Sequence, residues 1–376
     1  MISNCVDIIY ICLLKNGLHI DVIYIILDFF CANIDNVNIH DAVWLYKFDQ
    51  TEAIFKYGPI EHWKTNKVTN MSKLFKKSNI NSNINLWDVS NVTDMSHMFA
   101  YAESFNQPLN KWNVSNVIDM SSMFYNAISF NQPLNMWNTS NVTNMSSMFY
   151  FAESFDQLLD NWDTFNVHNM SYMFYNAISF NQPLNMWNTS NVCNMIAMFC
   201  NARSFDQPLN LWNVSNVNNM SVMFYCAESF NQSLNNWNTS NVQDMHSMFF
   251  LAKLFNQSLD NWNVSNVQNM ARFFCGAESF NQSLNKWNTS NVCDMNSMFN
   301  NAKLFNQPLN KWNVSNVKNM NRMFSNAKLF NQPLNNWNVE NVQHMNNIFY
   351  NAESFNQSLD NWNVNKMFCN FKLLNN

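Results

Sequence analysis

Apolar side chains recur along this chain at a fixed interval, which tryptophan marks most clearly. Trp87 and Trp112 are 25 residues apart, and the same step leads to Trp362 without an insertion or a deletion. A period in this range is typical of solenoids, in which each repeat stacks on the next. The pattern predicts three parts: an N-terminal segment over residues 1–62, a repeat array over residues 63–364 and a tail over residues 365–376.

Within each repeat the apolar positions follow two different spacings. Leu109, Trp112 and Val114 have the L-x-x-L-x-L spacing of a leucine-rich repeat, and the last two are two residues apart, which predicts a short strand with both side chains inward. The apolar residues from Val117 to Ala127 then recur at three or four residues, which predicts a short helix. Phe130 and the following corner return the chain to the next strand.

These spacings predict an α/β repeat fold, a leucine-rich-repeat-like solenoid. Each rung is expected to hold a short strand on the concave side, a short helix on the convex side and a tight return, in about 12 rungs. The apolar residues of segment 1–62 predict a helical cap, because a solenoid needs a terminal unit that covers its first rung. The methionines inside each repeat are expected to fill the core, since methionine packs well into irregular gaps.

Two amide positions stay constant from repeat to repeat. Glutamine recurs from Gln107 to Gln357, and asparagine recurs from Asn91 to Asn341. In stacked repeats such side chains bond the backbone or the amide of the next rung, so the expected role is structural.

The residue before each tryptophan varies from repeat to repeat, and a partner could recognise these differences. The predicted concave strand exposes this position, together with the serine position three residues after the tryptophan, from which Phe165 departs. Solenoids commonly bind partners through such a surface. The candidate binding face therefore consists of Lys111, Met136, Phe165, Met186, Leu211, Lys286 and Lys311.

Composition narrows the function. Only 12% of the residues are charged and the net charge is −5, which argues against nucleic acid as a partner, because a phosphate backbone needs a concentrated cationic face. The histidines at 97, 168, 246 and 344 fall in four different registers, so they predict no metal site. The repeated serines have no paired histidine and acid. We expect no catalytic residue, no cofactor and no enzymatic activity.

The cysteines and the N-terminal segment bear on location. Nine cysteines at irregular spacings are expected to be free thiols in a reducing compartment, with Cys200 and Cys226 as the pair that could approach on adjacent rungs. The apolar stretch from Ile8 to Phe30 is interrupted by polar residues, so neither a secretory signal nor a membrane span is expected. These features favour an intracellular location, in the host cytoplasm if the chain is viral. The many Asn-x-Ser/Thr sequons leave a glycosylated cell-surface protein as the alternative.

The repeat, from Phe-Asn-Gln-Pro-Leu-Asn through Trp-Asn-Val-Ser-Asn-Val to Met-Phe, resembles that of BspA-like leucine-rich-repeat surface proteins of mollicutes, protists and large DNA viruses. The resemblance covers residues 87–364. It implies a leucine-rich-repeat-like solenoid with a role in adhesion or protein binding, and it implies no catalytic residue.

The N-terminal segment carries a second resemblance. Residues 18–30, followed by Ala42 to Leu45, resemble an F-box, although His19 stands where an F-box has proline. The sequence therefore predicts a non-enzymatic scaffold that binds a protein or another macromolecule through its solenoid surface. The alternatives are an intracellular substrate adaptor that recruits ubiquitin-ligase machinery and a structural surface or virion protein.

Overall fold

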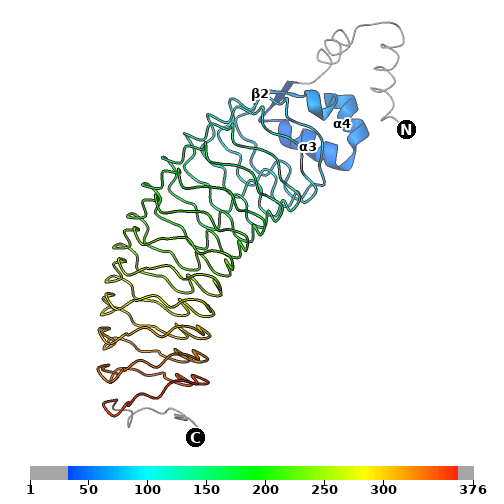
Figure 1. The fold of residues 1–376 in the computed structure, drawn as a ribbon. Coiled ribbons are helices and arrows are strands. Elements are labelled where there is room, and N and C mark those ends of the chain that lie inside the picture. The colour runs from blue at the N-terminus through cyan, green and yellow to red at the C-terminus, as the bar shows by residue number, and fades with distance from the viewer. Residues whose placement is uncertain (1–32, 363–376) are drawn as a thin grey trace.

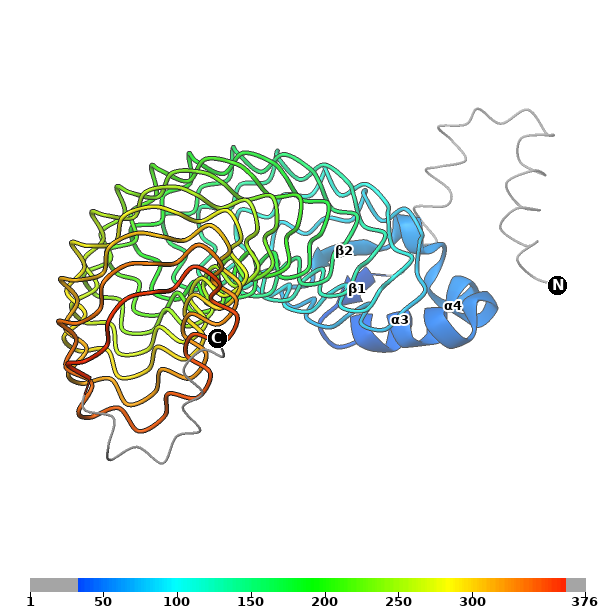
Figure 2. The ribbon, with the colours of Figure 1, turned by 60° about the horizontal axis from the view of Figure 1, so that its bottom comes forward.

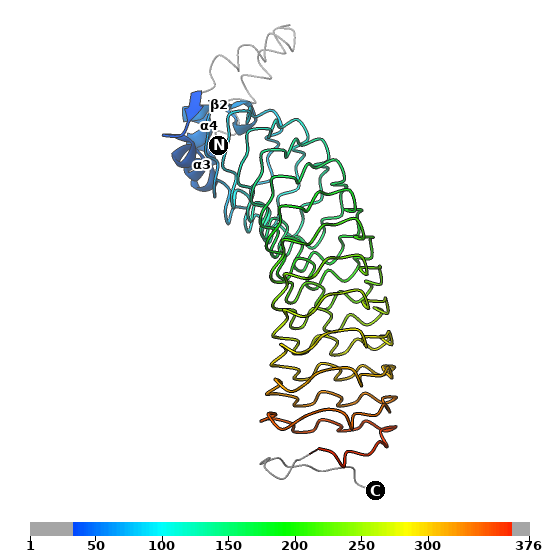
Figure 3. The same cartoon turned by 90° about the vertical axis from the view of Figure 1, so that its left-hand side faces the viewer.

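A computed structural model describes residues 33–362 of the chain. Figure 1 shows a long curved stack of rungs with two helices at its N-terminal end, and Figures 2 and 3 show that the stack also twists along its length. The described part therefore forms one elongated solenoid. The predicted tail at 365–376 and the first half of the F-box-like segment, residues 18–30, lie outside the described residues.

Regular secondary structure is confined to the N-terminal end of the described part. Its elements are β1 (Asn33–Asp35), α3 (Ile39–Phe48), α4 (Gln50–Tyr57), η1 (Ile60–His62) and β2 (Lys64–Lys67). The two strands pair in parallel. Asp49 begins α4 by accepting a hydrogen bond from the Glu52 amide at 3.0 Å, and Gly58 ends it with a φ of 78° that favours glycine.

Helix α3 is fastened to the first rungs of the array by both its apolar and its polar side chains. Ala42 and Val43 are buried on the core side of α3. The Lys47 ammonium donates to the Leu74 carbonyl at 3.1 Å and to the Lys76 carbonyl at 3.4 Å. Half-burial lowers the pKa of Lys47 below its ordinary value. The helix thus satisfies carbonyl groups that would otherwise lie at the open end of the stack.

The rungs are built from turns, and this corrects the predicted strand and helix. Between Lys67 and Trp362 the structure has neither a strand of several residues nor a helix, and single parallel bridges link equivalent residues, from Asn70 with Asp94 to Asn319 with His344. Trp112 and Val114 are buried as expected, but they follow a turn and do not form a strand.

The segment expected to be helical carries the hydrogen bonds between rungs. The amides of Met120, Ser122 and Phe124 donate to carbonyls of the next rung at 3.1, 2.8 and 2.9 Å. The amides between them close turns instead, as Met123 does onto the Met120 carbonyl at 3.2 Å. Consecutive turns of this kind repeat the apolar spacing of a helix, so the spacing alone did not distinguish the two. We call residues 118–126 and their equivalents the inner ladder.

Backbone conformation explains why no helix forms there. Ser122 and Asn126 have φ values of 54° and 56°, and the equivalent residues of the other rungs are also left-handed. A turn whose third residue has positive φ is a type II turn, whereas a helix needs negative φ throughout. Each rung therefore contains two left-handed residues, four positions apart, which turn its alternate amides toward the next rung.

The spacing between rungs shows which side of the array is concave. Equivalent rings are closest next to the inner ladder, where the Tyr125 and Tyr150 centroids are 4.3 Å apart. The distance rises to 5.7 Å between Phe124 and Phe149 and to 6.4 Å between Trp112 and Trp137. Because rungs of a curved stack lie closest on the inside of the curve, the inner ladder is concave and the tryptophans lie toward the convex side. The predicted placement of the two sides is wrong.

The two sides are joined by different bonds, and this difference accounts for the curvature. Backbone bonds hold the inner ladder near the ordinary strand spacing of about 4.8 Å. On the outer side, side chains bridge a wider gap. The Asn116 amide donates to the Ser90 carbonyl at 2.7 Å, and the Gln132 amide donates to Asn106 Oδ1 at 3.0 Å. The structural role expected for the repeated asparagines and glutamines is confirmed.

Val222 tests the left-handed positions, since it is a β-branched residue held at a φ of 62°. Asparagine tolerates this conformation far better. Val222→Asn is therefore expected to raise the free energy of unfolding by about 1 kcal/mol. Chemical denaturation measures the change, and Val222→Ala, which removes both γ-methyl groups but adds no side chain that favours left-handed backbone, should give a smaller gain. Equal or lower stability of the asparagine variant would contradict the assignment of strain.

Candidate binding surface

The concave side of the array carries a stripe of aromatic side chains. The residue after the constant phenylalanine of each rung faces this side, and it is tyrosine in three successive rungs, at Tyr125, Tyr150 and Tyr175. Their centroids are 4.3 and 4.6 Å apart with nearly parallel rings. Tyr101 and Tyr172 lie beside them, at 5.2 Å from Tyr125 and 6.1 Å from Tyr175. We call these five residues the tyrosine stripe.

The hydroxyl groups of Tyr125 and Tyr175 stay neutral over the physiological pH range. Burial raises the pKa of Tyr175 to about 12, and the neighbouring Cys200 adds to the shift. Burial also raises the pKa of Tyr125, together with hydrogen bonding to Tyr101. A neutral phenol offers an apolar ring and a group that both donates and accepts hydrogen bonds. The stripe is therefore suited to contacts with another macromolecule.

Cys200 and Cys275, two of the thiols on the same side, are poor nucleophiles. Burial raises the pKa of Cys200 to about 12 and that of Cys275 to about 11. A thiol must lose its proton to attack or to bind a metal, so neither residue is activated. Among residues 33–362 no group of three or more His, Cys, Asp or Glu side chains is placed to hold a metal ion. A search of the same residues for helices that could cross a membrane found none that is long and apolar enough.

Two carboxylates accompany the stripe without a cationic partner. Asn126 Nδ2 donates to Glu103 Oε1 at 3.2 Å, and Asn176 Nδ2 donates to Glu153 Oε1 at 3.1 Å. No Lys, Arg or His of the described chain lies within ion-pair distance of either glutamate. Later in the array the equivalent glutamates are paired, through Glu228 with Lys253 at 2.7 Å, Glu278 with Lys303 at 2.8 Å, and Glu353 with Lys328 at 3.0 Å.

The predicted binding residues lie on the other side of the molecule. Met136 and Met186 are 80% and 76% exposed in the row before the tryptophans, and Leu211 and Phe165 are exposed as well. Lys111 and Lys311 are also exposed, and Lys286 Nζ pairs with Asp260 Oδ2 at 2.7 Å. Asn161 separates Met136 from Met186 along the row, whereas Met186 and Leu211 lie on consecutive rungs. The structure places these residues in one exposed outer row, apart from Phe165, which stands in the serine row, and it does not gather them into a single apolar patch.

The sequence contained a signal for the inner stripe. The position after the constant phenylalanine is tyrosine or phenylalanine in five of the six rungs from Tyr125 to Phe250, and Cys200 interrupts the run. Sequence reasoning missed it because the predicted helix placed this position on the convex side. Once the backbone is known to form turns, the same residues point toward the inside of the curve.

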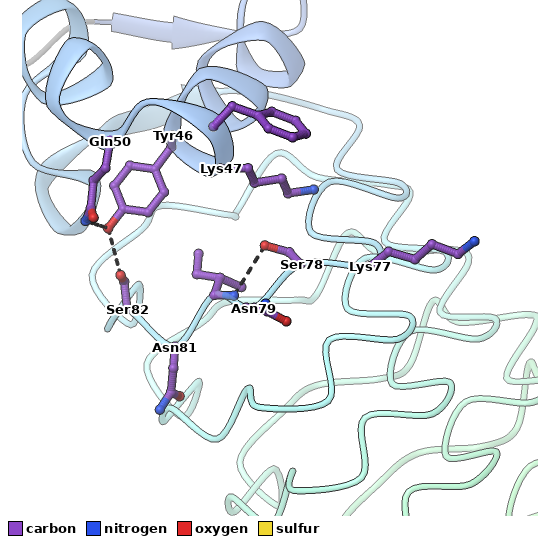
Figure 4. Close-up of a pocket in the computed structure, with 10 residues that line it drawn as sticks. Tyr46, Lys47, Gln50, Lys77, Ser78, Asn79, Asn81 and Ser82 are labelled. Carbon is purple, nitrogen blue, oxygen red and sulfur yellow. Dashed lines mark hydrogen bonds between the residues drawn. The ribbon is translucent and has the colours of Figure 1, made fainter.

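A hollow of about 410 Å³ lies where α3 meets the first rungs. Figure 4 shows Tyr46 reaching from α3 toward Ser82, with its hydroxyl 2.9 Å from Ser82 Oγ and accepting from Gln50 Nε2 at 2.6 Å. The polar groups drawn at this side of the hollow already bond one another. The hollow is therefore part of the contact between α3 and the array rather than a candidate ligand site.

His246 forms an ion pair on the inner ladder, and this pair should make the stability of the fold depend on pH. Its Nδ1 lies 3.0 Å from Asp244 Oδ1, and this hydrogen bond raises the pKa of His246 against the opposing effect of burial. The pair should stabilise the fold at pH values below about 6.5, and the contribution should disappear as the pH rises through the raised pKa.

The histidine pKa can be measured by NMR titration of the imidazole. Asp244→Asn should lower the pKa of His246, because burial then acts without the carboxylate. Asp294→Asn, at the equivalent position two rungs away, should leave it unchanged. A pKa of His246 that does not respond to Asp244→Asn would contradict the pairing.

A comparison with protein families agrees with a repeat architecture. A model of the family described as "Mycoplasma protein of unknown function, DUF285" matches residues 45–159, 134–235, 210–303 and 282–375. No curated protein matches the chain. Among solved structures, a chain titled "Crystal structure of TLR13-ssRNA13 complex" aligns with 11% identity and a TM-score of 0.29. The alignment covers 86% of this chain and 55% of that chain, so this chain spans about half of its length.

Proposed function

The chain belongs to the DUF285 family of mycoplasma proteins of unknown function, and from this premise we propose that it is a non-enzymatic scaffold that binds a protein partner along its concave face. The tyrosine stripe is the observation that carries the proposal. Tyr101 and Tyr172 are 39% and 38% exposed, and they flank the stacked rings of Tyr125, Tyr150 and Tyr175. Tyrosine is enriched at protein interfaces because its ring buries apolar area while its hydroxyl keeps a hydrogen bond.

A selection from a displayed peptide library tests which face binds. The intact chain is compared with an inner variant, Tyr101→Ser with Tyr172→Ser, and with an outer variant, Met136→Ser with Met186→Ser. Each pair lies two or three rungs apart and removes exposed apolar area, so the variants are matched. We expect selected peptides to lose most of their binding to the inner variant and to keep it with the outer variant. The reverse result would assign binding to the outer row, and no enrichment of any peptide would argue against a binding scaffold.

The remaining features extend the proposal. We infer that α3 and α4 cap the first of about 12 rungs, since α3 buries Ala42 and Val43 toward the array and Lys47 bonds its carbonyl groups.

The likeness to BspA-like proteins supports protein binding in adhesion. The five described cysteines are free, which supports an intracellular location. Treatment of the purified protein with an N-glycosidase tests this location, because a shift in mobility would instead indicate passage through a secretory pathway.

A second candidate function is the ligase adaptor, and the outer side of the helices favours it. Trp44 and Phe48 of α3 are both exposed, with ring centroids 4.9 Å apart, and Phe55 of α4 is exposed as well. Contiguous exposed apolar groups mark interaction sites, whereas singly scattered ones are ordinary surface. Affinity capture with the intact chain should recover ligase components, and Trp44→Ser with Phe48→Ser should lose them. Their absence from both captures would rule out the adaptor function.

A further inference from the structure

We propose that the N-terminal half of the concave face binds an extended basic peptide segment, in which arginine or lysine recurs at every third residue. The inference rests on the proposed function and names the chemical class of the partner. Three features carry it: the charge of these rungs, the unpaired carboxylates beside the tyrosine stripe, and the spacing of those carboxylates along the array.

Charge is distributed very unevenly along the array. Residues 78–202 contain eight carboxylates against a single cationic side chain, Lys111, a formal net charge of −7. Residues 203–362 contain nine carboxylates and nine Lys or Arg side chains, which balance. The acidic rungs are the ones that carry the tyrosine stripe. A surface of this sign attracts a cationic partner and repels nucleic acid.

The unpaired carboxylates form a repeated unit with the stripe. Glu103 accepts from Asn126, which follows Tyr125, and Glu153 accepts from Asn176, which follows Tyr175. In both cases the asparagine amide contacts Oε1, which leaves Oε2 without a hydrogen bond to another described side chain. A guanidinium or ammonium group could bond that oxygen and rest against the adjacent ring, where both contacts favour a cation.

The chain itself already places a cation against the stripe. Lys77 Nζ lies over the Tyr101 ring, 5.8 Å from its centroid. This contact ends the stripe at its N-terminal side, where Lys73, Lys76 and Lys77 belong to the first rung. Among residues 33–362 no cationic side chain lies over the Tyr172 ring in this way, and Tyr172 remains 38% exposed. A basic segment would therefore lie from Tyr101 toward Tyr175 and away from the lysines.

The spacing of the unit sets the periodicity of the partner. Two steps of the stripe, 4.3 Å and 4.6 Å, separate Tyr125 from Tyr175, and the two glutamates are offset by the same two rungs. A polyproline II segment advances by about 3.1 Å per residue, so three residues cover about 9 Å and return to the same side of the peptide. A cation at every third residue thus meets one carboxylate after another, whereas a cation at every second residue does not.

Fluorescence anisotropy with the full chain tests the proposal. The probes are a labelled peptide with arginine at every third position, a peptide of equal charge with arginine at every second position in one block, a peptide with glutamine in place of arginine, and a single-stranded RNA. We expect the first probe to bind most tightly at low salt and to weaken as salt screens the charges. Tighter binding of the RNA, or equal binding of the two arginine peptides, would overturn the inference.

A charge-matched pair of variants separates local contact from the general field. Glu103→Gln with Glu153→Gln removes the two inner carboxylates and should weaken binding about 10-fold. Asp88→Asn with Asp163→Asn removes the same charge from the same acidic rungs, but beside the convex tryptophans, where most rungs already have asparagine. This control should change the affinity less than about 2-fold. Equal losses from both pairs would show that no specific site exists.

The outcomes also separate this inference from the proposed function. If the glutamine peptide binds as well as the arginine peptide, and both are lost with Tyr101→Ser and Tyr172→Ser, the concave face binds peptides but not by charge. In that case the inference of a basic peptide partner is wrong, while the proposed scaffold function stands. If the library selection enriches peptides on the concave face that lack arginine and lysine, the same conclusion follows.

Discussion

Deleting one complete repeat, residues 201–225, is expected to give a folded array that is one rung shorter, whereas deleting half a repeat, residues 201–212, should unfold the rungs around the cut. The whole-repeat deletion joins Cys200 to Cys226, which occupies the next position of the same register. Every apolar position then meets its equivalent again. The half-repeat deletion joins Cys200 to Asn213 and places turn residues opposite core residues.

The size of the expected difference between the two deletions follows from the contacts between neighbouring rungs. Each rung contacts only its neighbours, and the stability of a solenoid is close to a sum over rungs and interfaces. Losing one rung removes one interface and leaves the others intact. Shifting the register exposes the Phe, Met and Trp stacks on both sides of the cut, and their burial is what offsets the entropy of ordering the chain.

Hydrogen exchange followed by mass spectrometry checks both variants. The inner-ladder amides, which donate across rungs, should remain protected throughout the whole-repeat variant. In the half-repeat variant the rungs next to the cut should exchange at the rate of unfolded chain. The deletion 201–225 brings Ile178 beside Glu228, so no like-charged pair arises there, and Glu228 keeps its ion pair with Lys253. Loss of protection in both variants would show that the repeats do not act as interchangeable units.

The second large effect is expected from the tryptophan stack. Trp237 is buried and lies between Trp212 and Trp262, with ring centroids 6.4 and 6.2 Å away. Trp237→Ala should lower the free energy of local unfolding by about 3–5 kcal/mol, because a cavity opens between two rungs that cannot close onto each other. Asn236→Ala, at the exposed neighbouring position, should change it by less than about 0.5 kcal/mol.

A phenylalanine variant separates the ring from its hydrogen bond. Trp237 Nε1 donates to the Leu209 carbonyl at 3.0 Å, and the same carbonyl accepts from the Trp212 amide at 3.1 Å. Since that oxygen keeps one partner, Trp237→Phe should cost less than the alanine variant, and its lost hydrogen bond should contribute about 1 kcal/mol. Exchange of the flanking amides measures local opening, which suits a repeat array that need not unfold in one step. Equal effects of Trp237→Phe and Trp237→Ala on local opening would contradict this separation of the ring from its hydrogen bond.

Much of this architecture was predictable from the residues. The 25-residue period determined the register, since a tryptophan or phenylalanine stack forms only when equivalent positions coincide. It also identified the inward residues, because Trp112, Val117, Met120 and Phe124 recur in every rung. The repeated asparagine and glutamine were assigned to structural amide bonds for the same reason, as a buried or bridging amide cannot change without losing its partner.

The candidate site was not predictable in the same way. A residue row can be identified by its variation, but its position relative to the curve depends on the spacing between rungs on each side. Met136 and Met186 were assigned to the concave face because the tryptophan segment was expected to be the strand. The structure places the backbone bonds at Met120 to Asn126 instead, which turns Tyr125 and Glu103 toward the inside of the curve.

The sequence by itself determined the solenoid, its period and its core, because these follow from which side chains avoid water and from how often they recur. Only the tertiary structure decided whether a spacing of three and four is a helix or a run of turns. The sign of φ at Ser122 and Asn126 depends on bonds from one rung to the next, and these bonds exist only in the stack. The concave face, and with it the tyrosine stripe, is a consequence of that choice.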